Sequence, residues 1–307
     1  MHASILKYFT EVARSGSIRK ASEELHVATS AVSRQIKKLE DELGTPLFER
    51  FSDGLRLTSA GEIVLRHAKE TLQDFEVMKS NLGDLQGKNT GRVHIAALDS
   101  LLVTFLPDFI KRFHRLHPAV DFRVRAGAYN NIFHFMAAGD IDIGISFDLA
   151  TPHDLKLVGS IRTAFMAMVA SSHPLARAKS VTLPECAQYK LLLALDSEVV
   201  SSAIAVELAG LNRVGRTLVA SNNPILLKPL IMSGDGIGFF TPVGLWPEIQ
   251  TGEIVAIPIR DFKLSTVDIG IFVPRDRHLT HASQAVIDLL NTELRRFGED
   301  LRAIVSR

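Results

Sequence analysis

Polar side chains with the chemistry to bind a nucleic acid share one face of a short predicted helix. Helical spacing from about residue 30 to residue 43 brings four of them together: Ser30, Ser33, Arg34 and Lys37. Hydroxyls and long cations donate hydrogen bonds to phosphates and base edges, and an arginine can bind a guanine through two such bonds. This face therefore indicates a contact with DNA.

An ordinary solvated surface is the alternative interpretation of the same face. Three acidic residues follow it directly: Glu40, Asp41 and Glu42. A cluster of charged residues on a helix most often marks a surface that faces water. The predicted structure around the helix distinguishes between the two interpretations.

Residues 1–58 supply those elements. The "SGS" at 15–17 ends a first helix, Ser17 can cap a second, and "HVATS" makes a tight break before the third, which Gly44 ends. Two helices joined by such a turn form a helix-turn-helix, whose second helix enters the major groove. The following "FERFSDGLRLT" predicts a small hairpin, on which Arg50 and Arg56 could reach the minor groove or the backbone.

A single proline-free helix is predicted from Ser59 to about residue 82, with a flexible linker by composition at 83–91, so that this region occupies 59–90. Its apolar residues follow a three-four spacing: Leu65, Ala68, Leu72 and Phe75. A seam of this length between domains finds little to pack against in its own chain. We expect a helix of a second copy to cover it, with packing on its own domains as the alternative.

From residue 91 the pattern changes to alternating strands and helices, which predicts α/β lobes built on parallel sheets. We expect lobe I to comprise 91–162 with 266–307 and lobe II to comprise 163–265. Two such lobes, joined by strands that cross from one to the other, form a cleft at the carboxyl ends of their strands. Ligands usually bind at this place in open α/β sheets.

Composition limits the classes of protein that fit. A chain of 307 residues suggests two or three domains, and its net charge of +1 requires any basic site to be local. Cys186 is the one cysteine, which excludes an intramolecular disulfide. The start lacks the apolar core of a signal peptide and no apolar run approaches the length of a membrane span, so we expect a cytoplasmic protein with no membrane contact.

A long ordered set of residues carries a family resemblance. "FTEVARSGSIRKASEELHVATSAVSRQIKKLEDELGTPLFERFSDGLRLTSAG" resembles the N-terminal winged helix-turn-helix of LysR-type transcriptional regulators. Further along, "FLPDFIKRFHRLHP", "GDIDIGI", "SSHPLA" and "SGDGIGFFTP" resemble landmarks of that family's co-inducer-binding domain, whose two lobes look like a periplasmic binding protein.

The resemblance implies a sequence-specific regulator that binds double-stranded DNA and a small-molecule effector, with RNA polymerase as a further partner. It also implies a homotetramer, dimerised through the long helix. Carried over to this chain, the DNA-binding residues are Thr29, Ser30, Ser33, Arg34, Lys37, Arg50, Arg56 and Thr58.

Three departures from the family pattern lie in the helix-turn-helix. Ile18 and Arg19 stand where relatives have Phe and Thr. Ser22 stands where relatives have a second alanine, and Ala28-Thr29-Ser30 replaces the usual Ser-Gln-Pro or Ser-Gln-Ser. The usual capping serine is therefore missing, and Thr29 is expected to cap instead. The half-site preference of relatives does not transfer to this chain.

The effector residues are also carried over by resemblance: Asp99, Ser100, Tyr129, Asn130, Phe147, Ser197, Asn222 and Thr241. Capping of the helix that begins near Leu101 is the alternative role of Asp99 and Ser100. Because this set has an acid and no lysine or arginine, we expect a neutral, cationic or zwitterionic effector.

An enzyme and a solute-binding protein are the rival interpretations. The pairs "HRLH" (114–117) and "HLTH" (278–281) lack the glutamate and third ligand of a zinc hydrolase, and "GDGIG" (234–238) precedes a strand where a nucleotide fingerprint would precede a helix. We expect no enzymatic activity, no metal and no cofactor. The attached helix-turn-helix argues against a solute-binding protein.

Overall fold

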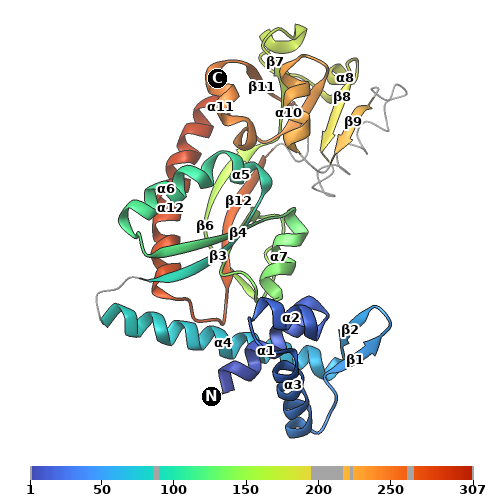
Figure 1. Cartoon of the computed structure of the whole chain (residues 1–307). Coiled ribbons are helices and arrows are strands. Elements are labelled where there is room, and N and C mark those ends of the chain that lie inside the picture. Colours follow the sequence, from blue (N-terminus) through green and yellow to red (C-terminus); the bar gives the residue numbers. More distant parts are fainter. Residues whose placement is uncertain (1, 86–89, 195–216, 222–223, 261–265, 306–307) are drawn as a thin grey trace. The chain divides into compact units, whose positions relative to one another are not determined.

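The computed structural model describes residues 2–85, 90–194, 217–221, 224–260 and 266–305 of the chain (Figure 1). Two compact units result. Unit 1 contains Met1–Thr90, Ala138–Asp140 and Asp276–His281, and unit 2 contains Gly91–Ala137, Ile141–Arg275 and Ala282–Arg307.

Three helices open unit 1: α1 (His2–Ser15), α2 (Ile18–Glu24) and α3 (Thr29–Leu43). The Ser17 hydroxyl accepts a hydrogen bond from the Lys20 amide and so caps α2. Gly44 ends α3 with φ of 67°, a left-handed conformation that glycine adopts without strain. The predicted helix order and both of these caps are confirmed.

An antiparallel hairpin, β1 (Phe48–Phe51) and β2 (Gly54–Leu57), follows α3. Its register pairs Phe51 with Gly54, so the predicted hairpin is present with its turn at residues 52–53. The hairpin leads into α4 (Ser59–Leu85), which continues three residues beyond its predicted end.

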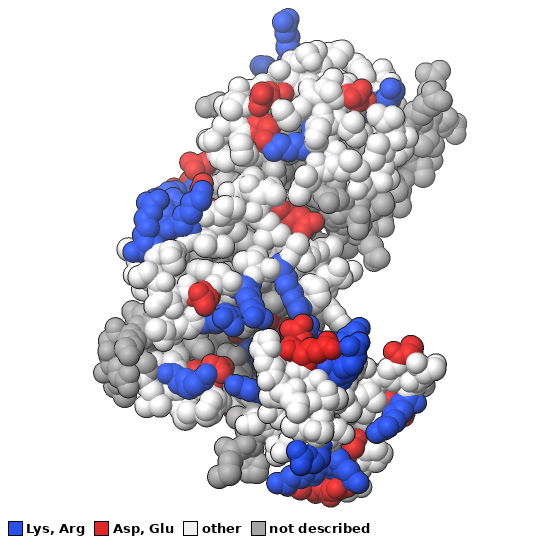
Figure 2. Space-filling view, in the orientation of Figure 1, with Lys and Arg blue, Asp and Glu red and all other residues white. Residues whose placement is uncertain are grey.

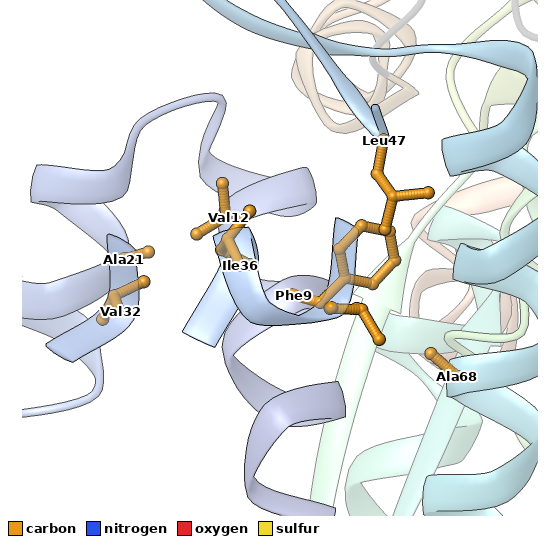
Figure 3. Close-up of a cluster of buried hydrophobic side chains, with 8 residues drawn as sticks. Phe9, Val12, Ala21, Val32, Ile36, Leu47 and Ala68 are labelled. Carbon is orange, nitrogen blue, oxygen red and sulfur yellow. The ribbon is translucent and has the colours of Figure 1, made fainter. Parts of the chain in front are cut away.

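One apolar cluster holds unit 1 together (Figure 3). Its buried members come from all four helices and from the segment before β1: Phe9, Val12, Ala21, Val32, Ile36, Leu39, Leu47 and Ala68. The α3 members lie on one side of that helix, so the cluster fixes α3 by its apolar face and leaves the polar face to solvent.

Unit 2 contains two five-stranded sheets. The sheet of lobe I has the order β4-β3-β5-β12-β6, in which β3 runs parallel to β4 and β5 while β12 runs antiparallel to β5 and β6. Its strands are β3 (Gly91–Ala97), β4 (Val120–Ala126), β5 (Ile143–Phe147), β6 (Leu155–Ala164) and β12 (Thr266–Pro274). Its helices are α5 (Asp99–Val103), α6 (Phe105–Leu116), α7 (Tyr129–Ala137) and α12 (His281–Val305).

The sheet of lobe II has the order β11-β7-β10-β8-β9. Its strands are β7 (Met166–Ala170), β8 (Leu191–Ala194), β9 (Thr217–Ser221), β10 (Ile237–Phe240) and β11 (Ile254–Pro258). Its helical segments are η1 (Pro174–Arg177), α8 (Leu183–Cys186), α10 (Pro224–Met232), η2 (Pro242–Leu245) and α11 (Trp246–Thr251).

Both sheets are mixed, whereas the strand-helix alternation predicts parallel ones. The chain passes from lobe I to lobe II between β6 and β7, and each of these strands runs antiparallel to its sheet neighbours. A crossing strand enters its sheet without the helical crossover that keeps neighbouring strands parallel. The predicted two-sheet α/β arrangement is otherwise the one observed.

Candidate functional site

The polar face of α3 is exposed along its length. Ser30, Ser33, Arg34 and Lys37 all face solvent, opposite the buried apolar residues of the same helix. Arg34 Nε donates to the Ser30 carbonyl at 3.3 Å, which leaves the two terminal nitrogens of its guanidinium free to bind elsewhere. Lys37 has no partner within the described part of the chain. The sequence thus places these four residues together correctly.

Thr29 does not cap α3, contrary to expectation. Ala28 is the capping residue and has no side-chain acceptor, so Thr29 is the first residue inside the helix. The Thr29 hydroxyl lies 2.8 Å from the Ser22 hydroxyl, and Ser22 donates to the Arg19 carbonyl at 2.7 Å. Ser22 and Thr29, two of the positions at which the sequence departs from the family pattern, therefore meet, and together they join α2 to α3.

The hairpin presents one free arginine and one engaged arginine. Arg50 is exposed and has no partner among the described residues. Arg56 pairs with Asp53 at 2.8 Å and lies 4.7 Å from the centre of the Phe51 ring. Because this pair is largely exposed it is weak, and Arg56 can leave it for a phosphate. Figure 2 shows Lys and Arg side chains over both α3 and the hairpin, beside Asp and Glu side chains.

Thr58 has a structural position that its sequence motif does not reveal. Its hydroxyl accepts from the Gly61 amide at 2.9 Å, which makes Thr58 the N-cap of α4. The same hydroxyl donates to the Pro46 carbonyl at 2.9 Å. The proton and one lone pair of the hydroxyl are thus used inside the protein, so its side chain fixes the start of α4, and the DNA contact through Thr58 stays a prediction.

Glu40 is a positioning residue that sequence reasoning misses. Its carboxylate accepts from the Leu47 amide at 2.8 Å and from the Phe48 amide at 3.3 Å. The carboxylate thereby joins the end of α3 to the start of β1. No spacing signal distinguishes Glu40 from Asp41 and Glu42, which are both exposed.

In unit 2, predicted effector residues from both lobes come together. Asp99 and Ser100 form the first turn of α5, which packs against η2 of lobe II. Gly244 of η2 allows this approach, because a Cβ there would lie 3.0 Å from Ser100 Cβ. Thr241, the residue before η2, is 5% exposed and makes no capping bond.

Asp99 is neither the N-cap of α5 nor part of an ion pair. The capping position is Leu98, without a side-chain bond, and Asp99 has no partner within the described chain. Burial raises the pKa of the Asp99 carboxyl, and no charged group contributes to the change. The capping alternative for Asp99 is therefore wrong.

Three of the other predicted effector residues belong to lobe I: Tyr129, Asn130 and Phe147. The Tyr129 hydroxyl donates to the Ala150 carbonyl at 3.3 Å, while Asn130 is exposed. Phe147, at the end of β5, has its ring centre 5.7 Å from that of Phe165, which lies between β6 and β7. Ser197 and Asn222 lie outside the described residues.

Two family models match the chain. One, described as bacterial regulatory helix-turn-helix protein, lysR family, matches residues 4–62, and the other, LysR substrate binding domain, matches residues 86–295. This chain belongs to the LysR family of transcriptional regulators. Among curated LysR-type relatives, the transcriptional dual regulator GltC of Bacillus subtilis is 30% identical over 279 residues, which cover 89% of this chain and 91% of GltC. The chain spans 60% and 64% of the length of two further curated relatives.

Solved structures of LysR-type proteins share the fold. A full-length point variant of OxyR from Pseudomonas aeruginosa has a TM-score of 0.72 and 19% identity, covering 96% of this chain and 95% of that one. The LysR-family protein CbnR, in complex with its target DNA, has a TM-score of 0.61 and 20% identity, covering 96% and 99%. The predicted fold class is thereby confirmed.

The linker helix α4 of this LysR-family chain has two different halves. Ala68 is fully buried in the core of unit 1 and Leu65 packs against that core, so the predicted intermolecular seam is wrong at Ala68. Leu72 is half-buried. Beyond it, three apolar side chains are 39% to 52% exposed: Phe75, Met78 and Leu82. Any seam between copies lies in this second half.

Other chemistry considered from the sequence receives no support from the described residues. Cys186 is buried and burial raises the pKa of its thiol to about 12, so it stays a protonated core side chain at neutral pH. Within the described chain, no three His, Cys, Asp or Glu side chains gather as metal ligands would. Among the described helices, none combines the length and apolar character needed to span a membrane.

Proposed function

We propose that this chain is a transcriptional regulator that binds double-stranded DNA through α3 and the β1–β2 hairpin and responds to a small molecule held between lobes I and II. The observation that carries the proposal is α3, whose apolar face is buried in the unit 1 core while Ser33, Arg34 and Lys37 face solvent. A helix held in this way presents its polar side chains as a rigid set, as entry into a major groove requires. CbnR, which shares the fold and was solved with its target DNA, supports this use of α3.

The DNA contact is tested with full-length protein and operator fragments selected from genomic DNA by the wild type. Arg34→Ala should weaken operator binding by about 1–3 kcal/mol if Arg34 reads a base. Lys37→Ala should weaken binding to every sequence and reduce the salt slope by about one unit, because one phosphate contact is lost. Lys7→Ala, which removes an exposed charge of α1, is the control and should bind normally. Wild-type affinity of both α3 variants at matched salt would refute the proposed contact.

Each function is assigned to its own part of the chain. We assign DNA binding to residues 1–58, dimerisation to 59–90, and effector binding to lobe I (91–162 with 266–307) and lobe II (163–265). The exposed Phe75, Met78 and Leu82 of α4 support a helix pair between copies. A tetramer, contact with RNA polymerase and a cytoplasmic location belong to the same proposal.

The effector site is proposed at the contact of α5 with η2. It joins the two lobes at Ser100 and Gly244, so a ligand there contacts both lobes and can favour one lobe arrangement over another. A screen of small molecules against the full-length protein tests it. Ligands that raise the melting temperature of the wild type should do so less in Thr241→Val.

A further inference from the structure

Three polar side chains lie at or next to the α5–η2 contact. Asp99, Ser100 and Thr241 have no side-chain hydrogen bond or ion pair within the described chain. Thr241 is 5% exposed, so water reaches it poorly. Buried polar groups are nearly always hydrogen-bonded in folded proteins, and an unpaired one costs free energy. Asp99 and Ser100 are half-buried and Thr241 is 5% exposed, and such polar groups at one contact between lobes indicate a ligand site.

The ends of two neighbouring strands place an aromatic pair beside Asp99. Parallel strands β3 and β5 pair Ala97 with Ile145, and the Leu98 amide donates to the Ile145 carbonyl. Asp99 begins α5 and Phe147 ends β5, each two residues beyond this pair, so both lie at the same edge of the sheet. The ring of Phe147 packs on Phe165, which adds an apolar wall.

Among the described residues, no cation pairs with the carboxyl of Asp99. Burial of the carboxyl raises its pKa, and no described lysine, arginine or histidine opposes this change. A carboxylate in that state gains more from an added cation than one already in an ion pair.

We propose that the effector carries a protonated amine that pairs with Asp99, while the hydroxyls of Ser100 and Thr241 hydrogen-bond to its neighbouring polar atoms. This inference rests on the proposed effector site between the lobes. An ammonium supplies both the opposite charge and the donors that Asp99 lacks. An anionic group would instead place a like charge beside Asp99. The Phe147–Phe165 pair suits the organic frame of such an amine.

The probes are matched triplets on benzyl, cyclohexyl and n-hexyl frames, each made as the amine, the alcohol and the carboxylate. Calorimetry with full-length protein at pH 7 measures their affinities. At least one amine should bind ten times more tightly than its carboxylate. Asp99→Asn should reduce that preference at least tenfold and leave the alcohol unaffected. Asp108→Asn is the control, because Asp108 is an exposed acid of α6 that pairs with Lys111 at 3.2 Å.

A second measurement keeps the test valid if Asp99→Asn fails to fold. Binding of the amine to wild type should weaken as the pH falls from 7 through the raised pKa of Asp99, because Asp99 takes up a proton while the amine keeps its own. Binding of the alcohol should not change. The proposal is overturned if the affinity for the amine does not change with pH and, where Asp99→Asn folds, does not change in that variant either. It is also overturned if the carboxylates bind more tightly than the amines.

The results distinguish a failure of the proposed amine from a failure of the proposed effector site. Alcohols or carboxylates that bind in preference to amines, and that Thr241→Val weakens, would overturn the amine and leave the effector site standing. If no probe of any charge binds, the amine is overturned and the proposed effector function loses its support as well.

Discussion

Thr58→Val tests whether Thr58 serves the fold or the DNA. Valine keeps the shape of threonine and removes the hydroxyl, which accepts from the Gly61 amide and donates to the Pro46 carbonyl. Loss of an N-cap costs about 0.5–2 kcal/mol. Because the Pro46 carbonyl also loses its donor, we expect the upper half of that range, about 1–2 kcal/mol.

The expected change falls on unit 1 alone. In a unit of this size, each kcal/mol lowers the melting temperature by about 4–8 °C. Trp246, the one tryptophan of the chain, lies in unit 2, so its fluorescence follows unit 2 while circular dichroism follows both units. The dichroism transition assigned to unit 1 should move and the fluorescence transition should not. Ser59→Ala is the control, because Ser59 is exposed and its side chain has no hydrogen bond among the described residues, so this variant should melt like wild type.

The opposite pattern would refute a capping role for Thr58. A Thr58→Val protein that melts like wild type and loses operator affinity at 20 °C would mean that the hydroxyl contacts DNA, as its motif suggests. Reduced melting temperature with normal affinity at 20 °C supports the capping role.

The remaining predictions concern three other places in the chain. Gly61→Ala should destabilise unit 1 by about 1–3 kcal/mol, measured by thermal unfolding, because the new Cβ would lie 2.2 Å from the Leu47 carbonyl oxygen. Phe75→Glu should give smaller particles in light scattering without unfolding unit 1, whereas Ala68→Glu should unfold it. Asp99→Asn should raise thermal stability at pH 7, since burial raises the pKa of Asp99 and the native state disfavours its charge. That gain should shrink as the pH falls through the raised pKa, because the wild-type carboxyl then becomes neutral too; an equal gain at pH 4 and pH 7 would contradict it.

Local signals in the sequence predicted unit 1 well. Ser17 and Gly44 act on their own turns, and the face that carries Arg34 and Lys37 follows from the helical period. The positions of Thr58 and Glu40 could not be predicted in this way. Each bonds to a residue seven to twelve positions away, at a point where chain segments meet in three dimensions, although the cap that Thr58 forms with Gly61 is local.

Burial of α4 shows a second limit of sequence reasoning. Leu65 and Phe75 fit the same apolar spacing, yet one packs on the core of unit 1 and the other is 39% exposed. Periodicity identifies the apolar face of a helix but not the partner that covers each part of it. In unit 2, strand order identified Asp99 at a sheet edge, whereas its contact with η2 depends on Gly244, which no motif marks.

The Ser22–Thr29 contact also determines which of the two hydroxyls donates the hydrogen bond between them. Ser22 has one proton and gives it to the Arg19 carbonyl, so Thr29 must supply the proton between the two hydroxyls. The exposed lone pairs of Thr29 can then only accept. Where Thr29 reaches a base, it suits the amino group of cytosine or adenine and opposes the O6 and N7 acceptors of guanine. Two hydroxyls between helices thus limit which bases this end of α3 can read.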